Sequence, residues 1–123
     1  MTYNKTEILD LLERHQIRPG RALGQNFVAD ANTVRRIARL AQVGPGSQVV
    51  EIGAGLGSLT LALLETGASV KAIELDRRLV RVLRETLEPR GVEIVEGDAL
   101  RLDWSEVCGP GGEWVLVANL PYN

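Results

Sequence analysis

Apolar residues at helical spacing mark the first element of the chain. Ile8, Leu11 and Leu12 recur at three- and four-residue intervals, which places their side chains on one face of a helix. Asn4 and Glu7 stand where a capping box would satisfy the free amides at the start of that helix. The pattern therefore predicts a short amphipathic helix near the N-terminus.

A second helix is predicted after a stretch that has no periodicity. Residues 16–27 contain one proline and two glycines and no regular apolar spacing, which is typical of a loop. Asp30 can then cap a helix that we expect Gly44-Pro45-Gly46 to end. The apolar face of this helix carries Val34, Ile37, Ala38 and Ala41. We assign residues 1–47 to an N-terminal helical cap segment.

From residue 48 onward, short apolar strands alternate with helices. Strands are expected at Gln48–Ile52, Ser69–Ile73, Val92–Glu96 and Trp114–Ala118. Helices are expected at Leu59–Glu65, which Gly67 stops, and from the Asp76 cap to just before Pro89 with Leu79, Val80, Leu83 and Leu87 on one face. A glycine-rich loop is expected before the fourth strand. Four strands joined by helical crossovers predict an α/β fold with a parallel, doubly wound sheet.

Composition narrows the class of protein. The chain has 123 residues, 45% of them hydrophobic and 24% charged, which is ordinary for one small globular domain. Its longest apolar runs are too short to span a bilayer, and the acids near the N-terminus are unlike a signal peptide. One cysteine and one histidine leave no disulfide framework and no ligand set for structural zinc. We therefore expect a cytoplasmic protein with no metal site and no membrane partner.

The charge is unevenly distributed. The net charge is -2, yet residues 1–47 hold seven basic and four acidic residues. Arginine accounts for most of the basic residues, and its planar fork suits phosphate. The pattern indicates either a solvated helix surface or a face that contacts nucleic acid.

The turn after the first expected strand carries the first candidate chemistry. Gly53, Gly55 and Gly57 are spaced G-x-G-x-G, whereas a dinucleotide-binding turn has the spacing G-x-G-x-x-G. Glu51 stands two residues before the first glycine, where a carboxylate would oppose a pyrophosphate but not a cationic amino-acid group. The turn favours S-adenosylmethionine over NAD, and a tight turn without a ligand is the remaining alternative.

Acidic residues also follow the next two expected strands. Glu74 lies 21 residues after Gly53 at a strand end, where it could accept hydrogen bonds from ribose hydroxyls. Asp98 ends the third strand and could accept a hydrogen bond from an adenine amino group. Alone, Glu74 is explained by a solvated strand end and Asp98 by a Gly-Asp turn, but ligands of open parallel sheets bind where strands end together.

The final segment, Asn119-Leu120-Pro121-Tyr122-Asn123, joins an amide, a rigid proline and an aromatic ring. By itself it is typical of a turn with a surface tyrosine. Together, four motifs resemble the S-adenosylmethionine-dependent rRNA adenine dimethyltransferases, most closely the type that dimethylates two adjacent adenines near the 3′ end of small-subunit rRNA. These motifs are Leu23-Gly24-Gln25-Asn26-Phe27, residues 50–60, Gly97-Asp98-Ala99 and the final segment. Val28 departs from the family, which usually has leucine there.

The resemblance implies a role for each matching residue. Asn26 and the backbone near Val28 would hold the methionine end of the cofactor, and Gly53 and Gly55 would let it pass close to the chain. The ribose and adenine contacts would come from Glu74, Leu75, Asp98 and Ala99. The catalytic motif would be Asn119, Leu120, Pro121 and Tyr122, with Asn119 also facing the reacting methyl.

The resemblance also implies a longer protein. Family members continue after the final motif with further strands and a small helical domain, so we expect residues 48–123 to be the cofactor-binding half of a methyltransferase domain. We expect this chain to bind the cofactor weakly, to transfer no methyl group and to self-associate through its fourth strand, whereas the full-length protein is expected to be monomeric. Three alternatives stay open: a large-subunit rRNA methyltransferase, a nicotinamide-dependent oxidoreductase, and a non-enzymatic module that binds rRNA or the ribosome.

Overall fold

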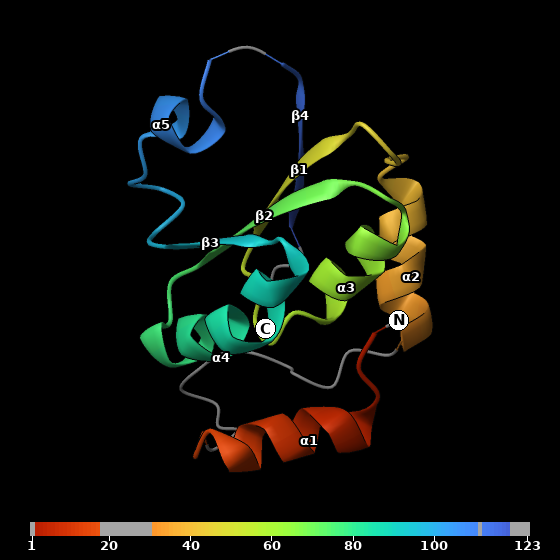
Figure 1. Cartoon of the computed structure of the whole chain (residues 1–123), viewed down its shortest axis with the longest axis vertical. Coiled ribbons are helices and arrows are strands. Elements are labelled where there is room, and N and C mark those ends of the chain that lie inside the picture. The colour runs from red at the N-terminus through yellow and green to blue at the C-terminus, as the bar shows by residue number, and fades with distance from the viewer. Residues whose placement is uncertain (1, 18–30, 111, 119–123) are drawn as a thin grey trace.

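The computed structural model describes residues 2–17, 31–110 and 112–118 of the chain (Figure 1). Within these ranges a four-stranded sheet is flanked by helices on both faces. The sheet carries the turn and the strand ends that form the candidate site.

The four strands are parallel, as their apolar sequences predict. They are β1 (Gln48–Ile52), β2 (Ser69–Glu74), β3 (Glu93–Glu96) and β4 (Trp114–Ala118), in the order β3-β2-β1-β4. In this register Ile52 lies between Ile73 and Ala118, and Glu74 lies opposite Glu96. The carboxyl ends of the strands therefore meet at one edge of the sheet.

Three helices cover one face of the sheet. They are α2 (Ala31–Leu40), α3 (Ser58–Glu65) and α4 (Arg77–Leu87). Val49 and Val70 of the sheet pack with α2 and α3, while Ala72 and Ile94 pack with α3 and α4. Helix α3 lies between α2 and α4 and packs on the sheet, so six of its eight residues are buried.

Helix α1 (Lys5–Arg14) lies against α4 (Figure 1). The predicted capping box is present: Asn4 Oδ1 accepts from the Glu7 N–H at 2.8 Å, and Glu7 Oε1 accepts from the Asn4 N–H at 3.0 Å. The predicted apolar stripe packs on Leu79 and Val82 of α4. A capping box and three apolar positions therefore suffice to place this short helix.

The opposite face carries a helix that the sequence pattern did not predict. Helix α5 (Trp104–Cys108) interrupts the expected loop before β4, and its N-cap Asp103 accepts from the Ser105 N–H at 3.0 Å. Val107 of α5 packs with Val50 and Ile73 of the sheet. The helix is too short for apolar periodicity to reveal it, and the aspartate cap was its available signal.

The end of α2 also differs from the prediction. The helix stops at Leu40, before the Gly44-Pro45-Gly46 segment, and Gln42 adopts a left-handed φ of 55°. A non-glycine residue therefore takes the conformation in which glycine usually ends a helix. Helix α4 ends at Leu87 as expected, followed by the short 3₁₀ helix η2 (Glu88–Arg90).

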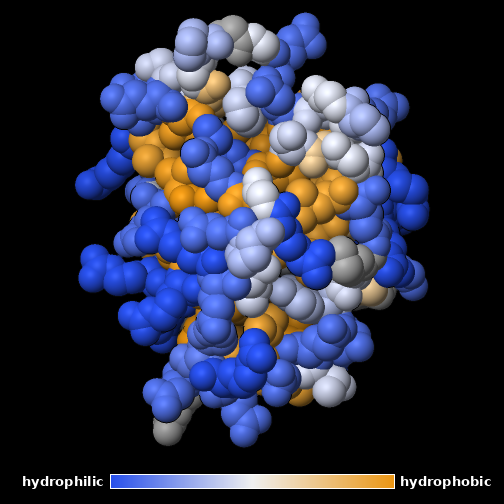
Figure 2. Space-filling model, viewed as in Figure 1, coloured by the Kyte–Doolittle hydropathy of each residue, from blue (hydrophilic) through white to orange (hydrophobic). Residues whose placement is uncertain are grey.

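The surface is mostly polar, with hydrophobic patches between the polar side chains. Figure 2 shows hydrophobic atoms reaching the surface in the upper half of the view, where Figure 1 places the sheet and α5. On β4, the side chain of Leu116 is 60% exposed. None of the helices in the described residues is long and apolar enough to cross a membrane.

Candidate functional site

The glycine turn connects β1 to α3 at the carboxyl edge of the sheet. Gly53 and Gly55 have φ values of 74° and 61°, which side-chain-bearing residues rarely adopt. A Cβ built on either glycine meets no atom of the described residues within 4 Å, so both positions border open space in this part of the structure. A Cβ on Gly57 would instead lie 2.6 Å from Leu87 Cδ1. The first two glycines can therefore face a ligand, whereas the third lets α4 pack closely on the turn.

Glu74 ends β2 directly beside this turn. Its Oε1 accepts from the Gly55 N–H at 2.8 Å, and its Oε2 accepts from the Asp76 N–H at 2.9 Å. The residue is only 3% exposed, and burial raises the pKa of its carboxyl while the amide bonds oppose that change. The structure thus brings the predicted ribose-binding acid and the glycine turn into direct contact.

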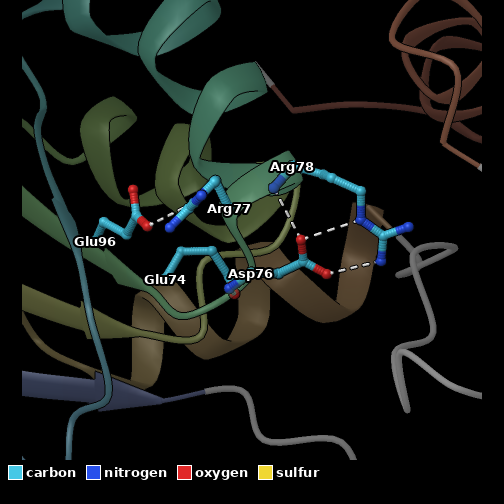
Figure 3. Close-up of polar contacts among 5 residues, drawn as sticks. All are labelled: Glu74, Asp76, Arg77, Arg78 and Glu96. Atoms are coloured by element: carbon cyan, nitrogen blue, oxygen red, sulfur yellow. Dashed lines mark hydrogen bonds and ion pairs between the residues drawn. The ribbon is translucent and has the colours of Figure 1, made fainter.

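The residues after Glu74 form the start of α4 (Figure 3). Leu75 is 66% exposed, so an apolar side chain stands open at the sheet edge. Asp76 caps α4 by accepting from the Arg78 N–H at 2.9 Å, as predicted, and its side chain also pairs with the Arg78 guanidinium at 3.0 Å. Those contacts lower the pKa of Asp76.

The third strand end lies next to the second. Glu96 Oε2 lies 3.4 Å from Arg77 Nε, across the start of α4 (Figure 3). Asp98 Oδ1 accepts from the Leu100 N–H at 2.9 Å, which folds residues 98–100 into a turn. The Asp98 side chain remains partly exposed, and the neighbouring Ala99 is half-buried. Glu74, Leu75, Asp98 and Ala99 therefore lie on adjacent strand ends at one edge of the sheet.

Glu51 differs from the position that its sequence spacing suggested. Its carboxyl is 1% exposed and accepts a short hydrogen bond from Thr60 Oγ1 in the first turn of α3. Burial raises the pKa of Glu51 to about 8, and the nearby Glu74 adds to the increase. The sequence pattern did not identify Thr60 as its partner, although the sequence has an acid before the turn and a hydroxyl after it.

The other candidate residues lie outside the described residues. These are Asn26 and Val28 of the cofactor segment, and Asn119, Leu120, Pro121 and Tyr122 of the catalytic motif. The predicted catalytic motif follows Ala118 in the sequence, and the register partner of Ala118 on β1 is Ile52. The strand that precedes this motif thus ends beside the glycine turn.

Three similar solved structures are methyltransferases by name. The 23S rRNA methyltransferase ErmE is 35% identical, with a TM-score of 0.67 over 79% of this chain and 38% of its own. A dimethyladenosine transferase from Plasmodium falciparum is 30% identical, with a TM-score of 0.61 over 76% of this chain and 33% of its own. An RNA methyltransferase from Salinibacter ruber, solved with S-adenosyl-L-homocysteine, is 30% identical, with a TM-score of 0.56 over 63% of this chain and 54% of its own.

Curated relatives are more similar in sequence. Ribosomal RNA small subunit methyltransferase A of Kineococcus radiotolerans is 52% identical over 95% of this chain and 40% of its own length. The protein of the same name from Cutibacterium acnes is 50% identical over 98% of this chain and 41% of its own length. The chain therefore spans about two fifths of the length of these relatives.

A family model supports the same assignment. The model for ribosomal RNA adenine dimethylase matches residues 15–123, which include the glycine turn, all four strands and the final motif. This match confirms the resemblance of the four motifs and disfavours a nicotinamide-dependent oxidoreductase. The chain belongs to the ribosomal RNA adenine dimethylase family.

Proposed function

We propose that this chain supplies the cofactor-binding and catalytic residues of an enzyme that dimethylates N6 of two adjacent adenines in small-subunit rRNA in the cytoplasm. The observation that carries the proposal is its 52% identity, over 95% of its length, to a ribosomal RNA small subunit methyltransferase A. The proposed substrate and activity are those of a whole protein as long as these relatives, of which this chain spans about two fifths.

The edge of the sheet suits S-adenosylmethionine. Open space borders Gly53 and Gly55, and Leu75 offers an exposed apolar surface for an adenine ring. Each Glu74 oxygen accepts one amide N–H and retains a lone pair for a ribose hydroxyl. Asp98 would accept from the adenine amino group beside Ala99, and Asn26 and Val28 would hold the methionine end.

The chemistry requires orientation more than activation. The cofactor supplies a methyl group on a positively charged sulfur. The Asn119 side-chain oxygen and the Leu120 carbonyl would accept hydrogen bonds from the adenine N6 and hold its lone pair in line with that methyl. Such alignment contributes ~7–11 kcal/mol in well-positioned systems. Pro121 would fix the backbone, and Tyr122 would stack on the extruded base, worth about 1–3 kcal/mol.

A chimaera tests this function directly. The chain would replace the aligned two fifths of the Kineococcus radiotolerans relative, and the purified chimaera would be given labelled S-adenosylmethionine and undermethylated small ribosomal subunits. We expect label on two adjacent adenines, and no label with Asn119→Ala. A soluble, cofactor-binding chimaera that transfers no methyl group would contradict the proposal.

Large-subunit rRNA is the second candidate substrate. The likeness to ErmE, a 23S rRNA methyltransferase, supports it, but the 35% identity is lower than that of the small-subunit relatives. Offering the chimaera both naked 23S rRNA and small subunits, then mapping the methylated base, separates the two. Subunit binding that survives both Asn119→Ala and removal of the cofactor would instead support a non-enzymatic module.

We also propose that this chain self-associates through β4, whereas the full-length protein is monomeric. Among the described residues β4 pairs with β1 alone, and its Leu116 is 60% exposed. An apolar strand edge of this kind favours pairing with a second chain. Leu116→Lys should lower the dimer fraction seen by sedimentation, whereas Leu9→Lys, an exposed change on α1, should not. Equal dimer fractions in both variants would contradict the role of β4.

A further inference from the structure

Glu51 is a buried acid for which the proposed methyl transfer has no use. Its register partners on the neighbouring strands are Ala72 of β2 and Val117 of β4, both apolar. The single described hydrogen-bond partner of its side chain is the Thr60 hydroxyl, and 1% of the residue is exposed. A carboxylate in this position would lack the solvation that an ion needs.

Among the described residues, no positive charge compensates for the burial of Glu51. From β2 it faces Glu74, another acid, and the described strand β4 carries no titratable side chain. From α3 it faces Thr60, while the acid of that helix, Glu65, lies at its far end. Burial and the Glu74 carboxyl together raise the pKa of Glu51 to about 8. Burial in these surroundings therefore favours the protonated side chain at pH values where a solvated glutamate is ionised.

The ligand proposed for this edge changes charge during the reaction. S-adenosylmethionine carries a sulfonium and an ammonium against one carboxylate, so its net charge is positive. S-adenosylhomocysteine has lost the sulfonium charge and is neutral overall. Glu51 precedes Gly53 by two residues, and Gly53 and Gly55 border the open space at the sheet edge. A charge on Glu51 would thus act on the donor and the product differently.

We propose that Glu51 is a proton-linked selector of the methyl donor: it ionises when the cationic donor binds beside the glycine turn, and it regains its proton when the neutral product remains. This inference rests on the cofactor assignment proposed above. Thr60 is the positioning residue, because its hydroxyl fixes the carboxyl beneath the turn. Linkage then requires that donor binding releases a proton and that product binding does not.

Isothermal titration calorimetry of the chain tests this linkage. S-adenosylmethionine and S-adenosylhomocysteine would each be titrated at pH 7 in phosphate and in Tris, whose ionisation enthalpies differ. We expect a buffer-dependent enthalpy, and so proton release, for the donor alone. If donor binding lowers the pKa of Glu51 by one unit from about 8, the preference for donor over product should rise about fivefold between pH 6 and pH 8.

Two variants define the outcomes. Glu51→Gln should abolish the proton release and make the donor preference independent of pH, whereas Glu88→Gln, an exposed acid on η2, should behave like the native chain. Binding of both ligands with a constant ratio would overturn the inference and leave the cofactor assignment intact. Binding of neither ligand would overturn the cofactor assignment, and this inference with it.

A measurement without ligand adds an independent check. Carboxyl ¹³C chemical shifts of the ligand-free chain, assigned by comparison with Glu51→Gln, report the titration of this side chain. We expect a midpoint near pH 8, as burial beside Glu74 requires. A midpoint at the ordinary value of a glutamate would overturn the inference, whatever the ligands do.

Discussion

The ends of β1 and β2 each bury a glutamate, yet the two acids have different surroundings. Glu74 is 3% exposed and accepts two backbone N–H groups, one of them from the glycine turn. Glu51 is 1% exposed and lies between Ala72 and Val117, with one hydroxyl as its hydrogen-bond partner. Similar burial thus accompanies two different sets of hydrogen-bond donors.

Burial raises the pKa of both acids, and the two differ in the hydrogen-bond donors that oppose this rise. Backbone N–H groups at Glu74 favour the ionised form and oppose the rise in pKa that burial causes, which makes this acid better suited than Glu51 to accept hydrogen bonds from a ligand. Glu51 has one hydroxyl donor in the described structure, and burial raises its pKa to about 8. We therefore expect Glu74 to bind the ligand and Glu51 to respond to the charge of the ligand.

Removal of the Glu74 charge should have the largest effect. In Glu74→Gln, an amide NH₂ replaces one oxygen and faces an N–H that donates to the native side chain. The loss of that bond and of the ribose acceptors should weaken S-adenosylmethionine binding about 100-fold, which corresponds to ~3 kcal/mol of binding free energy. Calorimetry at pH 7 measures the change.

Glu96→Gln is the matched control for this prediction. Glu96 ends the next strand, but its carboxylate contacts the exposed Arg77 instead of the glycine turn. We expect its affinity for the cofactor to stay within about threefold of native, since surface ion pairs contribute little. Equal losses in the two variants would show that Glu74 has no special place at this edge.

Replacement of Glu51 should affect stability in a pH-dependent way. A folded-state pKa of about 8 lies above the ordinary 4.5, so the folded chain binds this proton more tightly than the unfolded chain. The resulting stability is complete below pH 4.5 and is lost as the pH rises through 8. Between pH 6 and pH 8 the native chain should lose ~2 kcal/mol of unfolding free energy that Glu51→Gln retains.

Urea unfolding at several pH values checks this prediction. The difference between the native and Glu51→Gln chains should grow with pH, and Glu88→Gln should follow the native curve throughout. Parallel curves for the native chain and Glu51→Gln would show that Glu51 titrates normally, which contradicts the comparison of the two strand ends.

The sequence predicts the framework more fully than the chemistry of the site. Strands β1 and β4 have the predicted bounds, and the parallel sheet is confirmed, because buried apolar runs between turns are local signals. The Asp76 cap of α4 is local in the same sense and is also confirmed. The contact between Gly55 and Glu74 was beyond prediction, since it joins residues 19 positions apart through the sheet register.

Two further features were not predicted from the sequence pattern. The protonation of Glu51 depends on its strand neighbours Ala72 and Val117, which pattern alone does not place beside it. Helix α5 has five residues, fewer than two turns, so it carries no periodic signal. Short spans are recognised by caps, whereas the electrostatics of a site follow from the whole packing.

Removal of the Thr60 hydroxyl tests the surroundings of Glu51 near the end of β1. Thr60→Val keeps the shape of the side chain but deprives Glu51 of its donor, and should cost ~1.5 kcal/mol of unfolding free energy. Thr60→Ser keeps the hydroxyl and loses one methyl group, so it should cost less. Thermal unfolding at pH 6 compares them, and a serine variant less stable than the valine variant would contradict the hydrogen bond.

The smallest effect should come from a change after the end of β2, where Asp76 caps α4. Its side chain accepts from the Arg78 N–H and pairs with the Arg78 guanidinium, which lowers its pKa below the ordinary 3.8. The stability it adds is therefore present above pH 3.8 and lost as the pH falls through the lowered value. Asp76→Ala should cost ~1 kcal/mol at pH 7, as loss of an N-cap does, and the cost should shrink toward pH 2.

Asp76→Asn separates the cap from the charge. An asparagine still accepts from the helix N–H but loses the ion pair with Arg78, so it should cost less than Asp76→Ala and vary less with pH. Both variants keep the Asp76 backbone N–H that Glu74 accepts, so cofactor affinity should fall less than threefold. A loss of affinity as large as that of Glu74→Gln would mean that the side chain at 76, and not the backbone, holds the ribose-binding acid in place.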